Sequence, residues 1–268
     1  MHKENIMLKV AIETALEAGK FLKMNVGKIR RIERKDGQET NLVTEIDKKS
    51  EQLIINKIKQ HFPQHDFLCE ESGAAEVKSE YRWIIDPLDG TVNYTHALPI
   101  FCVSIGLEYK GEIILGVVYD PSLDELFTAE KGRGAKLNKK HIEVSKTTKL
   151  IESLVVTGFP YDVNEHPEPA VTHFRNFLAE SQAIRRLGSA ALDLCYVAAG
   201  RFDGFWEGVI RPWDMAAGVL IVTEAGGRWT DFHGSPSNVY REEMLATNGL
   251  IHEQMVGVLK KGDKKSKS

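Results

Sequence analysis

Trp83-Ile84-Ile85-Asp86-Pro87-Leu88-Asp89-Gly90-Thr91 is the stretch of sequence from which the fold and the site are most readily inferred. Its first part is apolar and predicts a buried strand, which would give way to a turn at Asp86. Pro87 fixes its own backbone φ angle and Gly90 frees the next corner, so this turn would hold the carboxylates of Asp86 and Asp89 close together. Taken alone, a sequence of this kind is more often a simple turn than a metal site.

Two further acidic segments also lie where a predicted element ends or begins. Glu70-Glu71-Ser72 follows a strand-like segment at 67–69, and Trp213-Asp214 opens a predicted helix that continues to residue 224. Taken separately, the two glutamates could be solvated loop charges, and Asp214 could simply cap its helix, a role that aspartate fills well.

A site built from these three acidic segments would require cations. The carboxylates would otherwise repel one another and take up protons. Oxygen ligands favour a hard ion such as Mg²⁺ or Mn²⁺ over zinc, and the nine histidines show no metal-ligand spacing. Residues 90–93 would expose backbone amides that suit a phosphate oxygen, and Thr91 adds a hydroxyl beside them. These are the requirements of metal-assisted phosphate ester hydrolysis.

The segments before this stretch are predicted to be helical. Apolar residues recur at steps of three and four between residues 6 and 22, which predicts a first helix. A second helix is expected from Thr44, where Thr44-Glu45-Ile46-Asp47 has the pattern of a capping box, to about residue 62. A polar loop at 33–41 would join the two helices.

The segments after it divide into two patterns. Strands at 81–85, 101–109 and 113–119, the last two forming a hairpin, predict an antiparallel sheet in the first half of the chain. Beyond about residue 150, strands and helices alternate, which is typical of an α/β arrangement. The strands are expected at 153–159, 183–187, 202–206 and 244–246, and the helices at 173–180, 190–199 and 215–224, followed by a closing helix.

Composition excludes several classes of protein. The 268 residues are 42% hydrophobic and 27% charged, values typical of a soluble globular protein, and the net charge of -3 gives no general attraction to nucleic acid. Three widely spaced cysteines predict neither a zinc site nor a disulfide framework. The apolar runs are far shorter than the roughly 20 residues that cross a bilayer, and the start of the chain lacks a signal-peptide pattern. A cytoplasmic protein is therefore expected.

Together these motifs resemble the inositol monophosphatase family over nearly the whole chain. The resemblance rests on segments that occur in the expected order: Asn41-Leu42-Val43-Thr44-Glu45-Ile46-Asp47, Glu70-Glu71-Ser72, residues 83–93, Gly188-Ser189-Ala190-Ala191, Gly204-Phe205-Trp206-Glu207 and Trp213-Asp214-Met215-Ala216-Ala217-Gly218. Residues 185–193 and 211–214 are more similar to the bacterial members than to the animal enzymes. The resemblance implies a layered αβαβα sandwich, one domain over residues 1–262 with halves of about 1–150 and 151–262, a basic tail at 263–268, and a homodimer.

The resemblance also implies a set of metal ligands. Glu70, Asp86 and the carbonyl of Leu88 would bind a first Mg²⁺, while Asp86, Asp89 and Asp214 would bind a second, so Asp86 would bridge the two ions. A third and weaker ion near Glu70 would be held mainly by water. Mn²⁺ is a possible replacement, and Li⁺ is expected to inhibit by competing at a metal site.

Two further roles follow from the resemblance. Asp47 and Thr91 would form a hydrogen-bonded pair that, with Glu70, orients and deprotonates the attacking water, although Asp47 has the competing role of a helix cap. Lys35 lies in the loop that the family uses as a lid near the metals, whereas a single lysine among other charges would otherwise face solvent.

The substrate contacts implied by the resemblance lie on both sides of the metals. The amides of Gly90 and Thr91 would hold phosphate oxygens, while Ala190, Glu207 and Asp214 would face the alcohol part of the substrate. Glu207 alone could equally be a charge at the rim of the site.

The function implied is that of a Mg²⁺-dependent phosphomonoesterase. It would hydrolyse myo-inositol 1-phosphate to inositol and phosphate by direct attack of metal-activated water, without a phosphoenzyme. Relatives with the same metal motif act on fructose 1,6-bisphosphate, NADP, nucleotide phosphates or histidinol phosphate, so these substrates are alternatives. A regulatory protein that binds RNA or the transcription machinery is an alternative of a different class.

Overall fold

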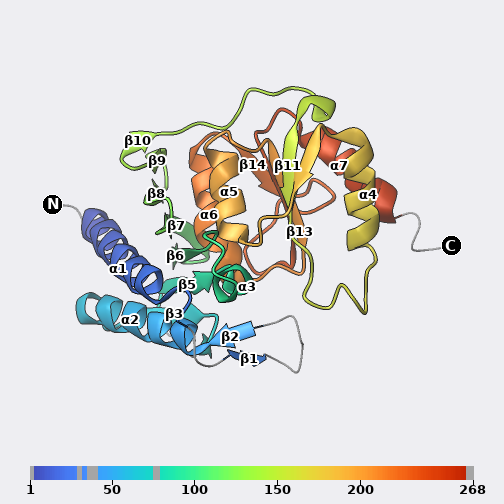
Figure 1. Cartoon of the computed structure of the whole chain (residues 1–268). Helices are drawn as coiled ribbons and strands as arrows, with labels where there is room; N and C mark the ends of the chain where they lie inside the picture. Colours follow the sequence, from blue (N-terminus) through green and yellow to red (C-terminus); the bar gives the residue numbers. More distant parts are fainter. Residues whose placement is uncertain (1–2, 29–31, 35–41, 75–78, 264–268) are drawn as a thin grey trace.

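The computed structural model describes residues 3–28, 32–34, 42–74 and 79–263, which form five stacked layers (Figure 1). A pair of helices, a sheet, a second pair of helices, a second sheet and a third pair of helices follow one another. This is the αβαβα sandwich that the sequence predicts. Lys35, Asn41 and the tail from residue 264 lie outside the described residues, while Asp263, the first residue of the predicted tail, ends the last helix.

The first sheet has, within the described residues, eight strands in the order β10-β9-β8-β7-β6-β5-β3-β4. Their bounds are β3 (Asp66–Cys69), β4 (Gly73–Ala74), β5 (Tyr81–Asp89), β6 (Cys102–Tyr109), β7 (Glu112–Asp120), β8 (Glu125–Glu130), β9 (Ala135–Leu137) and β10 (Lys140–His141). A separate pair of short strands, β1 (Ile32–Arg34) and β2 (Leu42–Thr44), precedes the second helix. Several strands were not predicted from the sequence: β1, which begins one residue before the predicted polar loop, β2, β4 and the strands β8 to β10.

The second sheet, again within the described residues, has five strands in the order β12-β11-β13-β15-β14. Their bounds are β11 (Leu154–Thr157), β12 (Ala183–Arg185), β13 (Gly204–Gly208), β14 (Arg228–Thr230) and β15 (Glu243–Thr247). β11 is parallel to both of its neighbours, whereas β13, β15 and β14 pair in antiparallel fashion. The prediction of an α/β second half is therefore confirmed for the strands on one side of this sheet.

The helices form the three layers around these sheets. α1 (Lys3–Asn25) and α2 (Glu45–His61) cover the outer face of the first sheet, and α5 (Ala190–Ala198) and α6 (Pro212–Glu224) lie between the sheets. α4 (Ala170–Glu180) and α7 (His252–Asp263) pack together on the outer face of the second sheet (Figure 1). Two shorter helices, α3 (Thr91–Thr95) and the 3₁₀ turn η1 (Leu150–Glu152), complete the described part of the chain.

Alternation along β5 explains why its residues 83–85 are all apolar. Trp83 and Ile85 are fully buried against α1 and α2, while Ile84 is fully buried against α5 and α6. Successive side chains of a strand point to opposite faces, so a strand covered on both faces must be apolar at every position. The cluster around Ile84 contains residues from both sheets.

The end of β5 differs from the sequence prediction. The strand does not stop before Asp86 but continues to Asp89, and its pairing with β6 shifts register between these two aspartates. A second difference is that β5 runs parallel to β3, not antiparallel. Both differences matter to the site, because they decide which acidic side chains lie next to one another.

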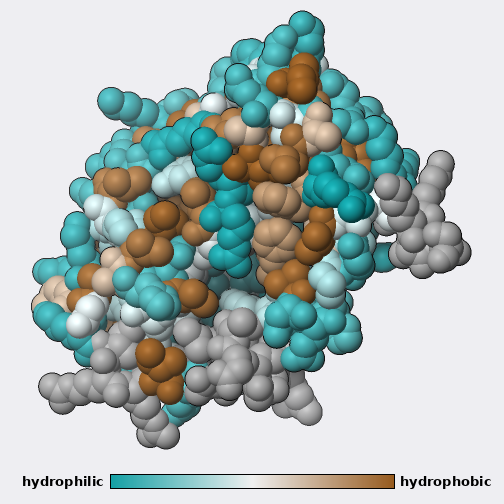
Figure 2. All heavy atoms as spheres, turned by 45° about the vertical axis from the view of Figure 1, so that its right-hand side comes forward, coloured by the Kyte–Doolittle hydropathy of each residue, from teal (hydrophilic) through white to brown (hydrophobic). Residues whose placement is uncertain are grey.

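No helix of the described residues is long and apolar enough to cross a membrane. On the face drawn in Figure 2, hydrophobic side chains lie among hydrophilic ones.

Candidate active site

Glu70 and Asp86 are brought together by the parallel pairing of β3 and β5. Cys69 lies opposite Ile85 in this register, and the Glu70 amide donates to the Ile85 carbonyl over 3.3 Å. Cys69 and Ile85 both face the layer of α1 and α2. The next residue of each strand, Glu70 and Asp86, therefore points toward the opposite face, where α5 and α6 lie.

The turn-like segment after Asp86 is fixed by hydrogen bonds from its own backbone and from α2. The Leu88 amide donates to Asp86 Oδ1 over 2.9 Å, and the Ser50 hydroxyl of α2 donates to the Pro87 carbonyl over 2.9 Å. The side chain of Leu88 is buried with the residues that face α1 and α2. Asp86 itself is only 2% exposed.

Asp89 is held by the start of α5, which comes from the second half of the chain. Its Oδ2 accepts hydrogen bonds from the Ser189 hydroxyl over 2.6 Å and from the Ala191 amide over 2.8 Å. The cysteine thiol of Cys102 also lies 3.7 Å from the same oxygen. The motif Gly188-Ser189-Ala190-Ala191 thus positions a carboxylate that lies about a hundred residues earlier in the sequence.

Glycine is the one residue type that fits at position 90. It has a φ angle of +96°, and a Cβ atom there would lie 2.8 Å from the Ile100 carbonyl oxygen and 3.3 Å from the Gly188 carbonyl oxygen. Gly90 is also the N-cap of α3, so the chain turns sharply from β5 into the helix that begins at Thr91.

Asp214 is the third residue of α6 and not its cap. The N-cap is Arg211, whose amide donates to Asp214 Oδ2 over 2.8 Å, as in one half of a capping box. The Ser104 hydroxyl of β6 donates to the Trp213 carbonyl over 3.3 Å and so ties the start of α6 to the first sheet. The alternative that Asp214 is the N-cap is therefore wrong: Asp214 supplies the N3 half of a capping box and also lines the pocket.

The electrostatics of these carboxylates show how closely they are grouped. Burial raises the pKa of Asp86 well above its ordinary value, and the charges of Glu70, Asp89 and Asp214 raise it further. Burial followed by the charges of Asp89 and Glu70 likewise raises the pKa of Asp214. Burial also raises the pKa of Asp89, against the hydrogen bonds from Ser189 and Ala191. A bound cation would relieve this repulsion.

The oxygen ligands of this site suit a hard divalent cation. No group of three or more His, Cys, Asp or Glu side chains in the described part of the chain could hold a metal ion as it stands. Each of Asp86, Asp89 and Asp214 has one carboxylate oxygen engaged by a protein hydrogen bond, which orients the second oxygen as a potential ligand. Oxygen donors alone fit Mg²⁺ or Mn²⁺ and not zinc.

Asp47 is both a helix cap and a partner of Thr91. Its Oδ2 accepts a hydrogen bond from the Thr44 amide over 2.9 Å, which completes a capping box at the start of α2. Its Oδ1 accepts a hydrogen bond from the Thr91 hydroxyl, also over 2.9 Å. The two roles that the sequence analysis treated as competitors therefore use different oxygens of one carboxylate, which is fully buried.

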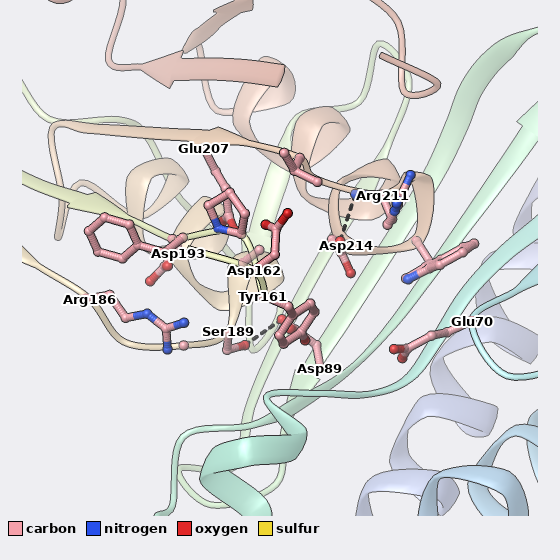
Figure 3. A pocket seen from close by; sticks show the side chains of 17 residues that line it. Glu70, Asp89, Tyr161, Asp162, Arg186, Ser189, Asp193, Glu207, Arg211 and Asp214 are labelled. Atoms are coloured by element: carbon pink, nitrogen blue, oxygen red, sulfur yellow. Dashed lines mark hydrogen bonds between the residues drawn. The ribbon is translucent and has the colours of Figure 1, made fainter. Parts of the chain in front are cut away.

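A cavity of about 500 Å³ is lined by some of these residues (Figure 3). Of the predicted site residues, its lining includes Glu70, Asp89, Ala190, Glu207 and Asp214. Asp47, Asp86, Leu88, Gly90 and Thr91 are not among the lining residues. Asp86 nevertheless lies close to three of the lining carboxylates, because their charges raise its pKa.

Sequence reasoning missed several residues that line the same cavity: Phe159, Tyr161, Asp162, Arg186, Asp193 and Arg211. Arg186 and Asp193 lie within a segment that was used only to identify the bacterial branch of the family. The sequence could have indicated Asp193, because it lies one helical turn after Ser189, the N-cap of α5. Glu51 was missed as well: it is 4% exposed on α2, and its carboxylate accepts the Glu71 amide over 2.8 Å, next to Glu70.

Solved structures of other proteins share this fold. The solved structure of an inositol monophosphatase from Anabaena (Nostoc) sp. PCC 7120 is 44% identical, covers 97% of both chains and has a TM-score of 0.88. The chain therefore shares the layered α/β fold of that class of protein.

Sequence relatives narrow the class to a family. Inositol-1-monophosphatase of Synechocystis sp. is 46% identical over 255 residues, which are 92% of this chain and 86% of the relative. The protein named Nus factor SuhB of Escherichia coli K12 is 40% identical over 251 residues, covering 93% of this chain and 94% of the relative. Residues 3–263 match the inositol monophosphatase family. The chain belongs to this family, and its membership supports a phosphatase.

Proposed function

We propose that the protein is a Mg²⁺-dependent phosphomonoesterase that hydrolyses myo-inositol 1-phosphate by direct attack of water. The observation that carries the proposal is that Glu70, which follows β3, Asp89 of β5 and Asp214 of α6 line one cavity, with Asp86 of β5 close to all three. Such a concentration of buried carboxylates is costly without cations, and phosphate esters are the substrates that divalent cations with oxygen ligands commonly serve.

The metal ligands in this proposal are those that the family pattern implies. Glu70, Asp86 and the Leu88 carbonyl would hold one ion, and Asp86, Asp89 and Asp214 would hold another. When bound, the ions would lower the pKa of a water molecule and neutralise charge on the phosphate group. Inhibition by Li⁺ and replacement of Mg²⁺ by Mn²⁺ belong to the same proposal.

Thr91 and Asp47 would accept the proton of the attacking water. The Thr91 hydroxyl is 2.9 Å from Asp47 Oδ1 and 3.1 Å from the Leu88 carbonyl, and both of these neighbours are hydrogen-bond acceptors. The hydroxyl proton is therefore directed away from the cavity, and a lone pair of Oγ1 is left to accept a proton from water. Burial raises the pKa of Asp47, so this carboxyl group is a better base than an exposed aspartate.

The phosphate and alcohol ends of the substrate would lie on different elements. The amides of Gly90 and Thr91 open α3 and lack partners within the helix, so they can bind phosphate oxygens. Ala190 and Glu207 line the cavity on the side of the second sheet, and Asp214 lies between the two ends, so these residues would contact the alcohol.

A substrate panel tests this proposal. The full chain is assayed with Mg²⁺ against myo-inositol 1-phosphate, fructose 1,6-bisphosphate, NADP and a nucleotide monophosphate, and phosphate release is measured. The proposal expects the largest kcat/KM for the inositol ester and no phosphate release after chelation of divalent cations. A preference for the bisphosphate or for NADP would overturn the assignment of substrate, and full activity with a chelator would overturn the role of metal.

A binding function is the second candidate, because several relatives are named Nus factor SuhB, including the protein from Escherichia coli K12. The two functions separate in the variant Asp86→Asn, which removes one charge without changing the surface, since Asp86 is 2% exposed. A protein that acts only by binding RNA or the transcription machinery would keep its partners in a pull-down and have no phosphatase activity to lose. A homodimer remains part of the proposal and is checked by sedimentation.

A further inference from the structure

Asp193 is a buried acid in the cavity for which neither the family motif nor the proposed mechanism provides a role. It lies in the first turn of α5 and is 1% exposed. Its Oδ1 atom is buried and has no hydrogen-bond partner in the described structure. Asp193 also lines the cavity, at the end away from Glu70 (Figure 3).

The side chains around Asp193 form a small group of charges. Glu207 of β13 and Arg186, which follows β12, line the same end of the cavity (Figure 3). Gly158 makes room for Glu207, because a Cβ atom at residue 158 would lie only 2.1 Å from Glu207 Oε2. Burial raises the pKa of Asp193, the charge of Glu207 raises it further, and Arg186 acts in the opposite direction. The charge of one guanidinium group thus acts on both carboxyl groups.

A purely structural role explains this arrangement poorly. A buried polar atom without a hydrogen bond destabilises the folded state, so an apolar residue would stabilise α5 better at this position. The start of α5 already has its own hydrogen-bonded anchor, because Ser189 and Ala191 bind Asp89. The unpaired oxygen is instead available to a donor that enters the cavity.

The chemistry of that donor follows from the charges. An ionised phosphate group offers hydrogen-bond acceptors and cannot donate to the unpaired Oδ1 of Asp193. A hydroxyl group can donate to Asp193 without adding charge, and an alcohol with several hydroxyls could satisfy Asp193 and Glu207 together.

We propose that Asp193 is a specificity-determining residue whose Oδ1 accepts a hydrogen bond from a hydroxyl group of the alcohol part of the substrate. This inference rests on the proposed function, because it assumes that a phosphomonoester occupies the cavity with its phosphate near Asp86 and Asp89. It adds a selection rule to that function: the far end of the cavity favours an uncharged polyol and disfavours a second phosphate.

The test compares Asp193→Ala, which removes the acceptor, with Asp193→Asn, which keeps an acceptor oxygen and the shape of the side chain. Two quantities are measured for each: kcat/KM for myo-inositol 1-phosphate, and the inhibition constant of inorganic phosphate, which occupies only the phosphate end. Asp120→Asn is the matched control, because Asp120 is 1% exposed, accepts hydrogen bonds from Ser122 and Leu123, and does not line the cavity.

Asp193→Ala is expected to lower kcat/KM by roughly 2- to 10-fold, the equivalent of losing one buried hydrogen bond. The inhibition constant of phosphate should stay unchanged, and Asp193→Asn should recover part of the loss. The inference is overturned if Asp193→Ala leaves kcat/KM unchanged, or if both variants weaken phosphate inhibition by the same factor as they lower kcat/KM. Wild-type hydrolysis of the inositol ester reports on the proposed function separately, since it does not depend on either variant.

Discussion

The two ends of the cavity are built in different ways. At the acidic end, Asp86, Asp89 and Asp214 each accept a hydrogen bond from a backbone amide, so their orientations are fixed by the fold. At the opposite end, Asp193 keeps an unpaired oxygen and Glu207 rests against a glycine. Groups that perform chemistry need exact placement, whereas groups that select an alcohol need only suitable donors and acceptors. The comparison therefore separates reaction type from substrate choice.

The largest effect is expected from Asp86→Asn at the acidic end. Removing this shared carboxylate should lower the rate of phosphate release by more than the roughly 10- to 100-fold that follows loss of an outer partner of a metal ligand. The rate is measured with myo-inositol 1-phosphate at saturating Mg²⁺, with Asp120→Asn as control. Wild-type turnover in Asp86→Asn would break the distinction between the two ends.

A smaller effect is expected at the junction of the two ends, where Asn93 of α3 is 8% exposed. Its Nδ2 donates to the Ile100 carbonyl over 2.9 Å and to the Leu187 carbonyl over 2.8 Å, and so ties α3 to the segment before Ser189. Asn93→Ala should destabilise the protein by about 1–3 kcal/mol, because it leaves buried carbonyl groups unpaired.

The free energy of unfolding in denaturant measures this effect. Thr95→Ala on the same helix is the control, because Thr95 bonds only to the Val92 carbonyl at an exposed position. Thr95→Ala should change the free energy of unfolding by no more than about 0.5 kcal/mol. Equal destabilisation by the two variants would mean that Asn93 does not connect the two ends.

A further effect concerns Glu207 at the alcohol end and depends on pH. Burial raises the pKa of Glu207 to about 8 from an ordinary value of 4.5. Ionisation is thus harder in the folded state than in the unfolded state, so the contribution of Glu207 to stability is fully present below pH 4.5 and is lost as the pH rises to about 8.

The substitution Glu207→Gln removes the loss of stability at high pH, because glutamine does not ionise. Without divalent cations, the variant should therefore gain stability over the wild type as the pH rises from about 5 to about 9. Thermal unfolding at several pH values measures the gain. A difference between the two proteins that is independent of pH would contradict the burial of an ionisable Glu207.

Local sequence predicts some of these features well. The capping box at Thr44 is confirmed as the start of α2, and Gly90 occupies a backbone conformation that favours glycine. The predicted turn at Asp86 was wrong, since the strand continues through a change of register. Pro87 lies within the change of register with β6 and does not end the strand, which ends at Asp89, directly before Gly90.

Long-range pairing could not be predicted from the residues alone. The neighbours Glu70 and Asp86 depend on a parallel register between β3 and β5, and Asp89 depends on α5, far along the chain. Periodicity reports which face of an element is buried, but not which element covers it. The resemblance to the inositol monophosphatase family supplied these pairings, whereas Asp193 belongs to no motif and was found only in the structure.

Binding of Mg²⁺ to the wild-type chain, measured by titration calorimetry in the presence of inorganic phosphate, tests the central claim most directly. The acidic end is expected to bind more than one Mg²⁺ per chain, and Asp86→Asn is expected to lose this binding. Absence of binding to the wild type, or the same binding to wild type and Asp86→Asn, would contradict the assignment of the acidic end as a metal site.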